Sequence, residues 1–311
     1  MGWGPCRGTG PSPIQSLIGA DRLARAMAVS AARTLAEDAA RAAGVELRLL
    51  TTLEDADRIL RVMVATWGEH QLVPREMIRA LADSGNIPYG AFRRDELVGY
   101  VLGWMGLDGD GPHVHSHMLA VLPGSRSGGV GYALKLAQRA QALEAGYRVV
   151  RWTFDPIQAR NAHFNLNKLG VQCDRFHRDF YGAMSDALNR GDRSDRLVVR
   201  WDLDQAVGSS TSPPRPHVDA LRASGPPEMP TPERGEEPAA DAGGSVRVGI
   251  PADYAGLKER DPALASEWRD AVGEVLERCF DLGMIVVGLM RDPDGPRYLL
   301  TAAATATGGS A

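Results

Sequence analysis

The sequence predicts a mixed α/β fold, on the basis of three observations. Short apolar stretches that are typical of strands alternate along the chain with longer stretches in which apolar residues recur at helical spacing. One apolar strand, expected at residues 114–122, ends in a glycine-rich loop that leads directly into a helix ending near residue 145. The chain has 311 residues, of which 44% are hydrophobic and 24% are charged, which is enough to bury a core without disulfides.

Charge and cysteine content argue against several classes of protein. A formal net charge of −4 gives no basic excess for binding nucleic acid. No apolar run approaches the roughly 18 residues that cross a membrane. Cys6, Cys173 and Cys279 are odd in number and far apart, so they form neither a zinc pattern nor a disulfide framework. We therefore expect a cytoplasmic protein without a metal site, and no nucleic-acid or membrane partner.

Composition divides the chain into four segments. Residues 1–20 are rich in Gly, Pro and Ser and are expected to be disordered, and Met27 is an alternative start of translation. Residues 21–204 form the main domain. Residues 205–243 hold eight of the twenty prolines and no aromatic residue, which predicts a disordered linker. Residues 244–303 form a small α/β extension that is expected to dock on the main domain.

The first half of the main domain is expected to begin with a helix over residues 21–43 that ends at Gly44. One stripe of that helix should pack on the domain, namely Leu23, Met27, Ala31, Leu35 and Ala39. Thr52 and Asp55 form a capping box at the start of a second helix. The other expected elements are a strand at 45–50, a helix from Pro74 to Gly85 and strands at 88–92, 97–105 and 114–122.

The second half should continue with a strand at 149–154, a helix at 158–169 stopped by Gly170, and strands at 173–181 and 197–203. In the C-terminal extension, a strand is expected at 246–250, helices at 253–257 and 262–281, and a hairpin formed by residues 284–290 and 298–301.

The glycine-rich loop at residues 123–131 is the strongest functional signal. A strand that turns through glycines into a helix points backbone N–H groups and the positive end of the helix dipole at one spot, which suits a phosphate. The dinucleotide pattern G-x-G-x-x-G fails because Leu134 follows Gly129 and Gly131. The G-x-x-x-x-G-K-[ST] loop fails because Val130 and Gly131 replace its Lys and Ser/Thr. The alternative is that the glycines are needed only for the turn between the strand and the helix, and that the loop binds no phosphate.

The pattern Arg126-x-x-Gly129-x-Gly131, after a strand ending Leu119-Ala-Val-Leu-Pro123, resembles the acetyl-CoA motif of the GNAT (Gcn5-related N-acetyltransferase) superfamily. Asn161-Ala162 and Lys168-Leu169-Gly170 downstream also fit, and the resemblance covers roughly residues 45–203. It implies a GNAT-type mixed, mostly antiparallel twisted sheet with helices on both faces. It also implies that acetyl-CoA or another acyl-CoA is bound as co-substrate by Leu119, Ala120, Val121, Arg126, Ser127, Gly128, Gly129, Val130, Gly131, Tyr132 and Asn161.

The resemblance further implies acyl transfer to a primary amine by direct attack in a ternary complex. Where relatives place a carboxylate base, this chain has His113, His115 and His117 on one face of the expected strand. His115 or His117 is a candidate base, and the alternatives are histidines that line the cleft or that hold a metal ion. Leu166 stands where many relatives carry a tyrosine that acts as general acid, so that role is either unfilled or taken by another hydroxyl, for example that of Tyr181 or Tyr132.

The acceptor is expected to be a small amine or an amino-acid-like molecule, and a homodimer is compatible with the sequence. Arg190, Arg193 and Arg196 either bind a substrate carboxylate or, as neighbouring aspartates favour, belong to a solvated loop. Asp155 is either a base or, as its place before Pro156 favours, a helix cap. Because the usual carboxylate and tyrosine are missing, a non-catalytic CoA-binding or regulatory module is the alternative function, and a scaffold that binds no CoA is a third.

Overall fold

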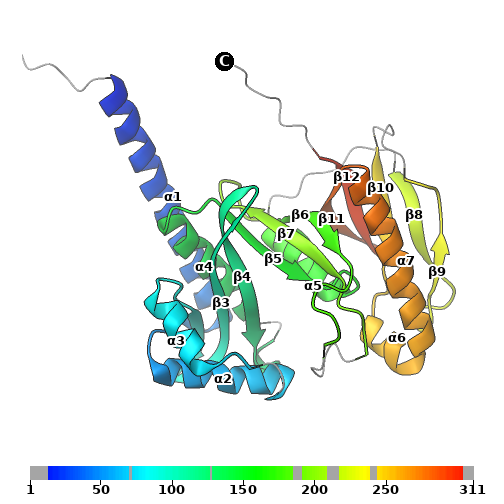
Figure 1. Ribbon diagram of the computed structural model, residues 1–311, viewed down its shortest axis with the longest axis horizontal. Helices are drawn as coiled ribbons and strands as arrows, with labels where there is room; N and C mark the ends of the chain where they lie inside the picture. The colour runs from blue at the N-terminus through cyan, green and yellow to red at the C-terminus, as the bar shows by residue number, and fades with distance from the viewer. Residues whose placement is uncertain are drawn as a thin grey trace, which may run out of the picture.

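The computed structural model describes residues 13–69, 72–126, 128–184, 191–208, 217–238 and 244–303. The strands of these residues form one 12-stranded sheet with the order β1-β2-β3-β4-β5-β7-β6-β11-β12-β10-β8-β9 (Figure 1). Of the neighbouring pairs, β4–β5 and β8–β10 are parallel and the others are antiparallel. The fold is therefore a mixed α/β fold with a mostly antiparallel sheet, as the sequence predicts.

The elements of the first part lie close to their expected positions. The helices are α1 (Pro13–Ala43), α2 (Leu53–Trp67), α3 (Arg75–Asp83), α4 (Val130–Glu144) and α5 (Ala159–His163), which continues as a π-helical turn, Phe164–Leu169. The strands are β1 (Glu46–Leu49), β2 (Tyr89–Arg93), β3 (Glu96–Asp108), β4 (Gly111–Val121), β5 (Val149–Phe154), β6 (Gln172–His177) and β7 (Arg196–Asp202). Since β6 ends at His177, Tyr181 lies in the turn after the strand and not within it.

The start of α2 follows from its capping residues. The side chain of Thr52 accepts a hydrogen bond from the backbone N–H of Asp55 at 3.1 Å, and the Asp55 carboxylate accepts one from the N–H of Thr52 at 3.0 Å. This reciprocal pair is the capping box expected from the sequence. It fixes where the chain enters α2, which covers the early part of the sheet.

Helix α1 differs from its prediction in both its start and its buried face. It begins at Pro13, so residues 13–20 are helical rather than disordered, and residues 1–12 lie outside the described part of the chain. The face packed on α4 consists of small residues at four-residue spacing, whereas Leu23 and Met27 are each 64% exposed. Leu35 is also exposed, and the buried residues are Ala32, Ala36, Ala40 and Ala43. Alanines allow the two helix axes to approach closely, an advantage that the larger apolar side chains lack.

The expected disordered linker, residues 205–243, contains two strands, β8 (His217–Ser224) and β9 (Thr231–Arg234). Parallel pairing with the following strand, β10, gives the backbone of β8 its hydrogen-bond partners. The described prolines of this stretch fall between strands or in β9, an edge strand, where a missing N–H is tolerated. Residues 209–216 and 239–243 of the expected linker lie outside the described residues.

The C-terminal unit consists of β8 to β12 with α6 and α7. Its remaining elements are β10 (Ser245–Gly249), α6 (Tyr254–Arg260), α7 (Pro262–Asp281), β11 (Met284–Asp292) and β12 (Gly295–Ala302). It continues the sheet through pairing of β11 with β6 at Val286 and Cys173. One hydrophobic cluster extends from α1 and α4 to α7, so the unit shares its core with the rest of the chain.

Helices cover the two faces of the sheet unequally. In Figure 1, α1, α4 and α5 lie on one face, while α2 and α3 lie at one end of the opposite face and α7 lies at its other end. Among the described residues, no helix covers the middle of that opposite face, over β4, β5 and β7 (Figure 1). This part of the sheet is called the open strip below.

The alanine face of α1 leads to a first prediction. Ala36 is 4% exposed, so Ala36→Leu should force the α1 and α4 helices apart and lower the free energy of unfolding by about 1–3 kcal/mol. Urea unfolding followed by circular dichroism measures this change. Leu23→Ala is the matched control and should change the stability by less than about 0.5 kcal/mol, because Leu23 is exposed. A larger loss for Leu23→Ala than for Ala36→Leu would show that the packed face is misassigned.

Candidate active site

The site is organised by two neighbouring parallel strands that pair over only part of their length. β4 and β5 are paired at Val114–Val150 and His115–Arg151, and no further pair joins them. Beyond these residues β4 continues its pairing with β3, and β5 continues its pairing with β7. The two strands therefore diverge towards their C-terminal ends, and their facing backbone groups remain free for a ligand in the opening.

At the end of β4 the glycine loop leads into α4. Gly129 has a φ of 86° and is the N-cap of α4 without any side-chain hydrogen bond to the first turn. The left-handed conformation requires glycine at this position. The first N–H groups of α4 are thus available to an anion, and the helix dipole favours negative charge there. A Cβ added at Gly131 would lie 3.8 Å from Leu119 and Val121, an ordinary contact, so packing does not require that glycine.

The other expected CoA contacts occupy varied positions. Leu119 and Val121 are half-buried on β4, but Ala120 points into the core under α2. Arg126 donates from Nε to the carbonyl of Val121 at 3.1 Å, so that carbonyl is already occupied. The remaining expected contacts are Gly128, which is exposed, Val130, which is buried, Tyr132, which packs against the core, Asn161, which is exposed, and Ser127, which lies outside the described residues.

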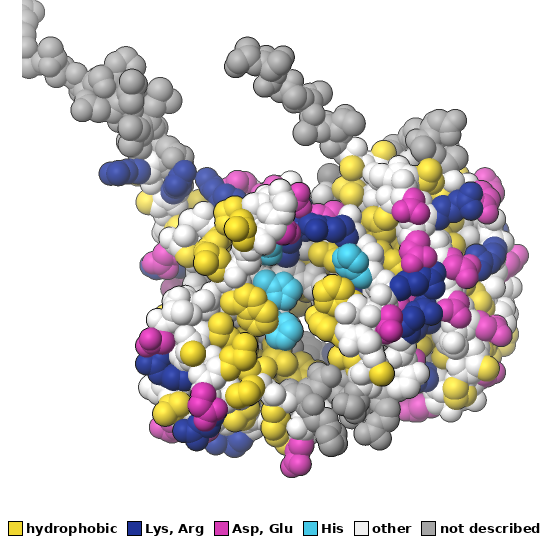
Figure 2. Space-filling view, in the orientation of Figure 1, with side chains coloured by type: hydrophobic (Ala, Val, Ile, Leu, Met, Phe, Trp, Pro, Cys, Tyr) yellow, Lys and Arg dark blue, Asp and Glu magenta, His cyan; other side chains and the backbone are white. Residues whose placement is uncertain are grey.

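On the open strip, Trp104, His115 and His117 form one aromatic group. The ring centroid of Trp104 lies 5.2 Å from that of His115 and 4.7 Å from that of His117. The pairing of β3 with β4 shifts register between Leu102 and Gly103, which leaves His117 as the extra residue of a β-bulge in β4. Figure 2 shows the histidines beside hydrophobic side chains where the surface is hollowed between the two ends of the sheet. At this bulge the side chain of His117 is exposed and lies against Trp104 of β3.

His113 belongs to a different environment from the other two histidines. It is 8% exposed, and its Nδ1 faces the carbonyl of Gly111 at 3.2 Å and a carboxylate oxygen of Asp108 at 3.9 Å. The ring centroids of His115 and His117 are 5.8 Å apart. Among the described residues, no group of three or more His, Cys, Asp or Glu side chains is placed to hold a metal ion.

Burial and neighbouring charge keep His115 neutral. Desolvation is the main cause that lowers its pKa to about 4, and His117, His113 and Lys135 add to this effect. Partial burial lowers the pKa of His117 as well. Both imidazoles are thus free to accept a proton at neutral pH. His117 is the more accessible of the two, because it is exposed at the bulge.

Tyr181 lies beside β5, the strand next to the one that carries the histidines. Its hydroxyl lies 3.3 Å from Oγ1 of Thr153, a residue of β5. Side chains alternate along β5, and Arg151 lies beside His115 in the sheet, so Arg151 and Thr153 point to the same face as His115. The three residues expected to be catalytic, His115, His117 and Tyr181, thus border the same open strip. Leu166, which stands where the resemblance places a tyrosine, is fully buried.

The loop residues expected to be solvated are instead part of a packed network. Asp195 is 1% exposed and accepts two hydrogen bonds from Arg193, while Arg196 is 7% exposed. Arg190 lies outside the described residues. Asp155 accepts from the N–H of Ile157 but does not cap α5, whose N-cap is Gln158, and both of its oxygens bind Arg269. A salt bridge across 114 residues of sequence could not be inferred from local pattern.

Sequence reasoning also missed a buried lysine at the point where β4 and β5 begin to diverge. Lys135 of α4 donates to Ser116 Oγ at 2.9 Å and to Gln138 Oε1 at 3.0 Å, and its Nζ lies 3.5 Å from the ring centroid of Trp152. Complete burial lowers its pKa well below the ordinary value. A charged residue within an otherwise apolar helix stripe is the one signal that could have identified it.

A family of known proteins matches the segment that contains these strands and the glycine loop. The profile of the acetyltransferase (GNAT) family matches residues 53–170, from the first residue of α2 to the glycine that ends the π-helical turn. This segment is a GNAT acetyltransferase domain, which confirms the resemblance for this part of the chain. The match is shorter than the expected range of residues 45–203, and it includes β4, β5 and the glycine loop. None of the curated proteins compared with the chain matches it in sequence.

Several solved structures are similar to about half of the chain. A putative GNAT-family acetyltransferase from Desulfovibrio desulfuricans is 20% identical, with 51% of this chain and 99% of that chain covered and a TM-score of 0.41. Chaetomium thermophilum Naa20 with a bisubstrate analogue is 19% identical over 51% and 87%, with a TM-score of 0.43. The ribosomal-protein-S18-alanine N-acetyltransferase of Escherichia coli is 12% identical over 54% and 99%, also with a TM-score of 0.43. No described helix is long and apolar enough to cross a membrane.

The pKa of His115 gives a prediction for stability. The folded protein disfavours the charged imidazole, so between pH 6.5 and about 4 the unfolded chain binds more protons at this residue. The contribution of His115 to the free energy of unfolding should be complete above pH 6.5, fall as the pH is lowered to about 4, and stay constant below that. Urea unfolding at a series of pH values measures this, with His115→Gln showing a flatter profile. An NMR titration of His115 with a midpoint near 6.5 would contradict the assignment.

Proposed function

We propose that the protein is an acyl-CoA-dependent N-acyltransferase that moves an acetyl or similar acyl group from the CoA thioester to a primary amine. The observation that carries this proposal is the divergence of β4 and β5 directly below the glycine loop and the start of α4. An opening between two strands offers backbone hydrogen bonds along its length and an anion site at its end. These two features suit the pantetheine arm and the pyrophosphate of CoA respectively.

The acyl-CoA would bind with its pyrophosphate at residues 128–132 and its arm beside β4. Gly131 allows close approach of the backbone, and the exposed Arg126 adds positive charge near the loop. Since Arg126 already binds the carbonyl of Val121, the arm would depend on the backbone groups nearer to Leu119. The thioester would then lie near the bulge at His117, where a backbone N–H can polarise its carbonyl.

The reaction needs a base for the amine and an acid for the departing thiolate. His117 is our candidate base, because it is exposed at the opening and neutral at physiological pH. His115 lies beside it and, with a pKa near 4, is the weaker base of the two. Tyr181, beside β5, is the candidate acid. The amine would attack the thioester carbon directly, the C–N bond would form as the C–S bond breaks, and no acylated protein residue is required.

The acceptor is proposed to be a small amine or an amino-acid-like molecule that binds on the open strip. The similar structures include an aminoglycoside acetyltransferase from a soil metagenomic sample and Arabidopsis thaliana NAA60 with a bisubstrate analogue. Trp104 and the two histidines give one side of the strip an aromatic surface that suits an apolar group beside the amine. The cytoplasm and a homodimer remain our expectations for the location and the assembly.

A second candidate function is a CoA-binding module without turnover. Leu166, fully buried where relatives carry a tyrosine, favours it, as does the absence of a carboxylate from β4. Such a protein would bind acyl-CoA with the same loop but would release no free CoA with any amine. Measurement of thiol release across an amine panel separates the two functions.

The CoA site is tested by Gly131→Asp. The added carboxylate should repel the pyrophosphate and weaken acetyl-CoA binding by at least about tenfold in calorimetric titration. The fold should tolerate it, because a Cβ there meets only ordinary contacts. Gly109→Asp, in open space at the β3–β4 turn, is the control with the same added charge and should bind acetyl-CoA like the wild type. Equal binding of acetyl-CoA by the wild type, Gly131→Asp and Gly109→Asp would contradict the assignment of the CoA site to this loop.

The catalytic assignment is tested by His117→Ala and Tyr181→Phe. Loss of the general base should lower kcat about 10²- to 10⁴-fold, whereas binding of acetyl-CoA should change little. Tyr181→Phe removes the proposed proton donor for the departing thiolate and should also lower kcat, with little change in the binding of acetyl-CoA. Steady-state kinetics over pH 5–9 measures both effects. Retention of full kcat by His117→Ala, with His115→Ala strongly impaired, would transfer the role of base to His115.

A further inference from the structure

The turn that ends β5 is held by the C-terminal unit. Arg269 of α7, which is 4% exposed, binds both carboxylate oxygens of Asp155, at 3.2 Å and 3.1 Å. The hydroxyl of Tyr298, from β12, donates to the carbonyl of the next residue, Pro156. Two elements of the C-terminal unit thus converge on two successive residues. The end of β5, one wall of the proposed site, is fixed from outside the segment that matches the GNAT family.

The same arginine also reaches the connection between β6 and β7, residues 178–195, described at 178–184 and 191–195. Asp192 accepts from the hydroxyl of Tyr254 at 3.0 Å and pairs with Lys258 at 2.9 Å. Arg269 lies 3.4 Å from the Asp192 carboxylate, and its Nε donates to the hydroxyl of Tyr254 at 3.3 Å. One buried guanidinium therefore joins the β5 turn to the β6–β7 connection.

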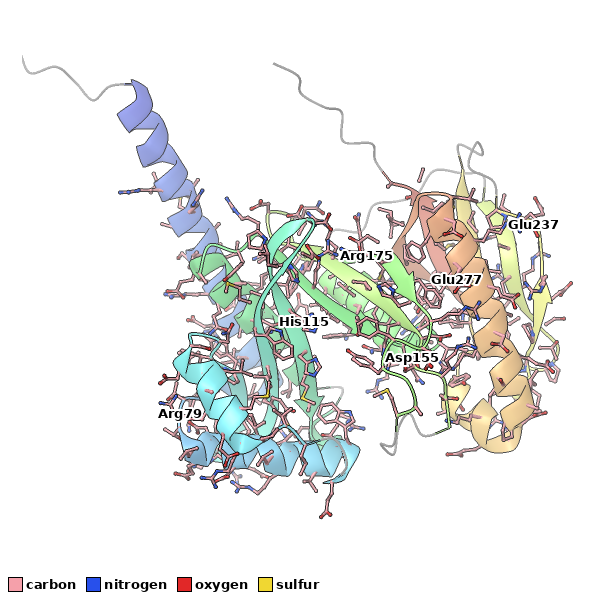
Figure 3. The ribbon with its side chains drawn as sticks, viewed as in Figure 1. Arg79, His115, Asp155, Arg175, Glu237 and Glu277 are labelled. Carbon is pink, nitrogen blue, oxygen red and sulfur yellow. The ribbon has the colours of Figure 1, made fainter. Side chains whose placement is uncertain are left out.

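From Asp192 a short chain of contacts leads to Tyr181. Arg193 donates to Asp270 of α7 at 2.7 Å and holds Asp195. Ser194 lies between Arg193 and Asp195 in the sequence. Its carbonyl accepts a hydrogen bond from the backbone N–H of Phe180 at 3.0 Å, and its hydroxyl accepts one from the backbone N–H of Tyr181 at 2.9 Å. The Tyr181 hydroxyl then meets Thr153 on β5. The path returns to its start, because Asp155, at the end of β5, is bound by Arg269. Figure 3 labels Asp155 between the end of β5 and the C-terminal helices.

The network is more than is needed to attach α7 to the sheet. Trp268, Val272 and Leu276 of α7 are buried in the shared core, and their apolar burial already holds the helix in place. A buried arginine between two carboxylates adds little net stability. Its guanidinium group is planar and rigid, so it can bind the carboxylates only when they lie in a narrow range of positions. Its effect is to specify the positions of the groups it binds.

We propose that Arg269 is a positioning residue for the acceptor side of the site, and that the C-terminal unit exists in part to place Tyr181 over β5. The functional part of this inference rests on the proposed acyl transfer. The placement of Tyr181 is a separate claim that can be measured without activity. The C-terminal unit is thereby a component of the site and not an independent appendage.

The placement of Tyr181 is tested by ¹⁹F NMR of the full chain labelled with 3-fluorotyrosine. The chain has seven tyrosines, and the signal absent from Tyr181→Phe identifies Tyr181. Arg269→Lys keeps the charge but loses the two-pronged contact, so it should shift or broaden this signal. Tyr254→Phe removes only the hydroxyl that joins Arg269 to Asp192 and should act in the same direction. It serves as the second variant if Arg269→Lys does not fold.

Kinetics separate positioning from stability. For folded Arg269→Lys well below its melting temperature, kcat/KM for the acceptor should fall by about tenfold or more, since misplacement by about 1 Å can cost about a hundredfold. The Kd for acetyl-CoA should stay within about twofold of the wild type, because the glycine loop is not part of the network. If Arg269 had a purely structural role, Arg269→Lys would lower the melting temperature and leave kcat/KM for the acceptor and the Kd for acetyl-CoA unchanged.

Arg234→Lys is the matched control. Arg234 of β9 pairs with Glu274 of α7 on the surface, so it links the same helix without contact to Asp155 or Asp192. It should leave the Tyr181 signal and the kinetics unchanged. An unaltered Tyr181 signal in both Arg269→Lys and Tyr254→Phe would overturn the inference. If the wild type transfers no acyl group, the proposed function fails, and the NMR result still decides whether Arg269 positions Tyr181.

Discussion

The structure of the site depends on the incomplete pairing of β4 with β5. A continuous ladder between them would satisfy every backbone group and leave no opening in the sheet. Pairing at only two positions instead leaves a row of unpaired donors and acceptors that faces a gap. The free start of α4, the bulge at His117 and the hydroxyl of Tyr181 are useful because they surround this gap. The glycine loop alone would offer an anion site without room for the rest of a cofactor.

Where β4 and β5 begin to separate, the space between them has to be filled on the side of α4. Ser116 and Trp152 flank the last paired residues on the side of α4, and Lys135 fills the space between them with an aliphatic stem and a hydrogen-bonded amine. The opposite side of the sheet carries the histidines. The two faces therefore differ, since one packs against α4 around Lys135 and the other carries the aromatic group of Trp104, His115 and His117.

Much of the fold follows from local sequence, and the missing parts involve contacts distant in sequence. The capping box of Thr52, the extent of α7 and the glycine loop are local patterns and were predicted correctly. The packed face of α1 was wrong, because hydrophobic size does not indicate that a close helix contact selects alanine. Strands β8 and β9 were read as linker, because proline content outweighed pairing with a strand that comes later in the chain.

The candidate site was predictable to a similar degree. The spacing of His115 and His117 placed them correctly on the strand before the loop, but alternation alone could not reveal the bulge that gives His117 its exposure. Asp155 binds Arg269 of α7, 114 residues away, and Asp192 binds Tyr254 of α6, 62 residues away. Separations of this length cannot be inferred from local sequence pattern. A helix cap and a solvated loop were the natural local interpretations of these aspartates.

The large sheet has two free edges, and open edges can recruit strands of other chains. β1 at one edge has only four residues and includes Glu46 and Arg48, which form an ion pair. β9 at the other edge also has four residues and contains Pro232, Glu233 and Arg234. Short length, charge and proline are the features that discourage edge-to-edge association. The chain can therefore extend one sheet across two structural units without offering either end as a template for aggregation.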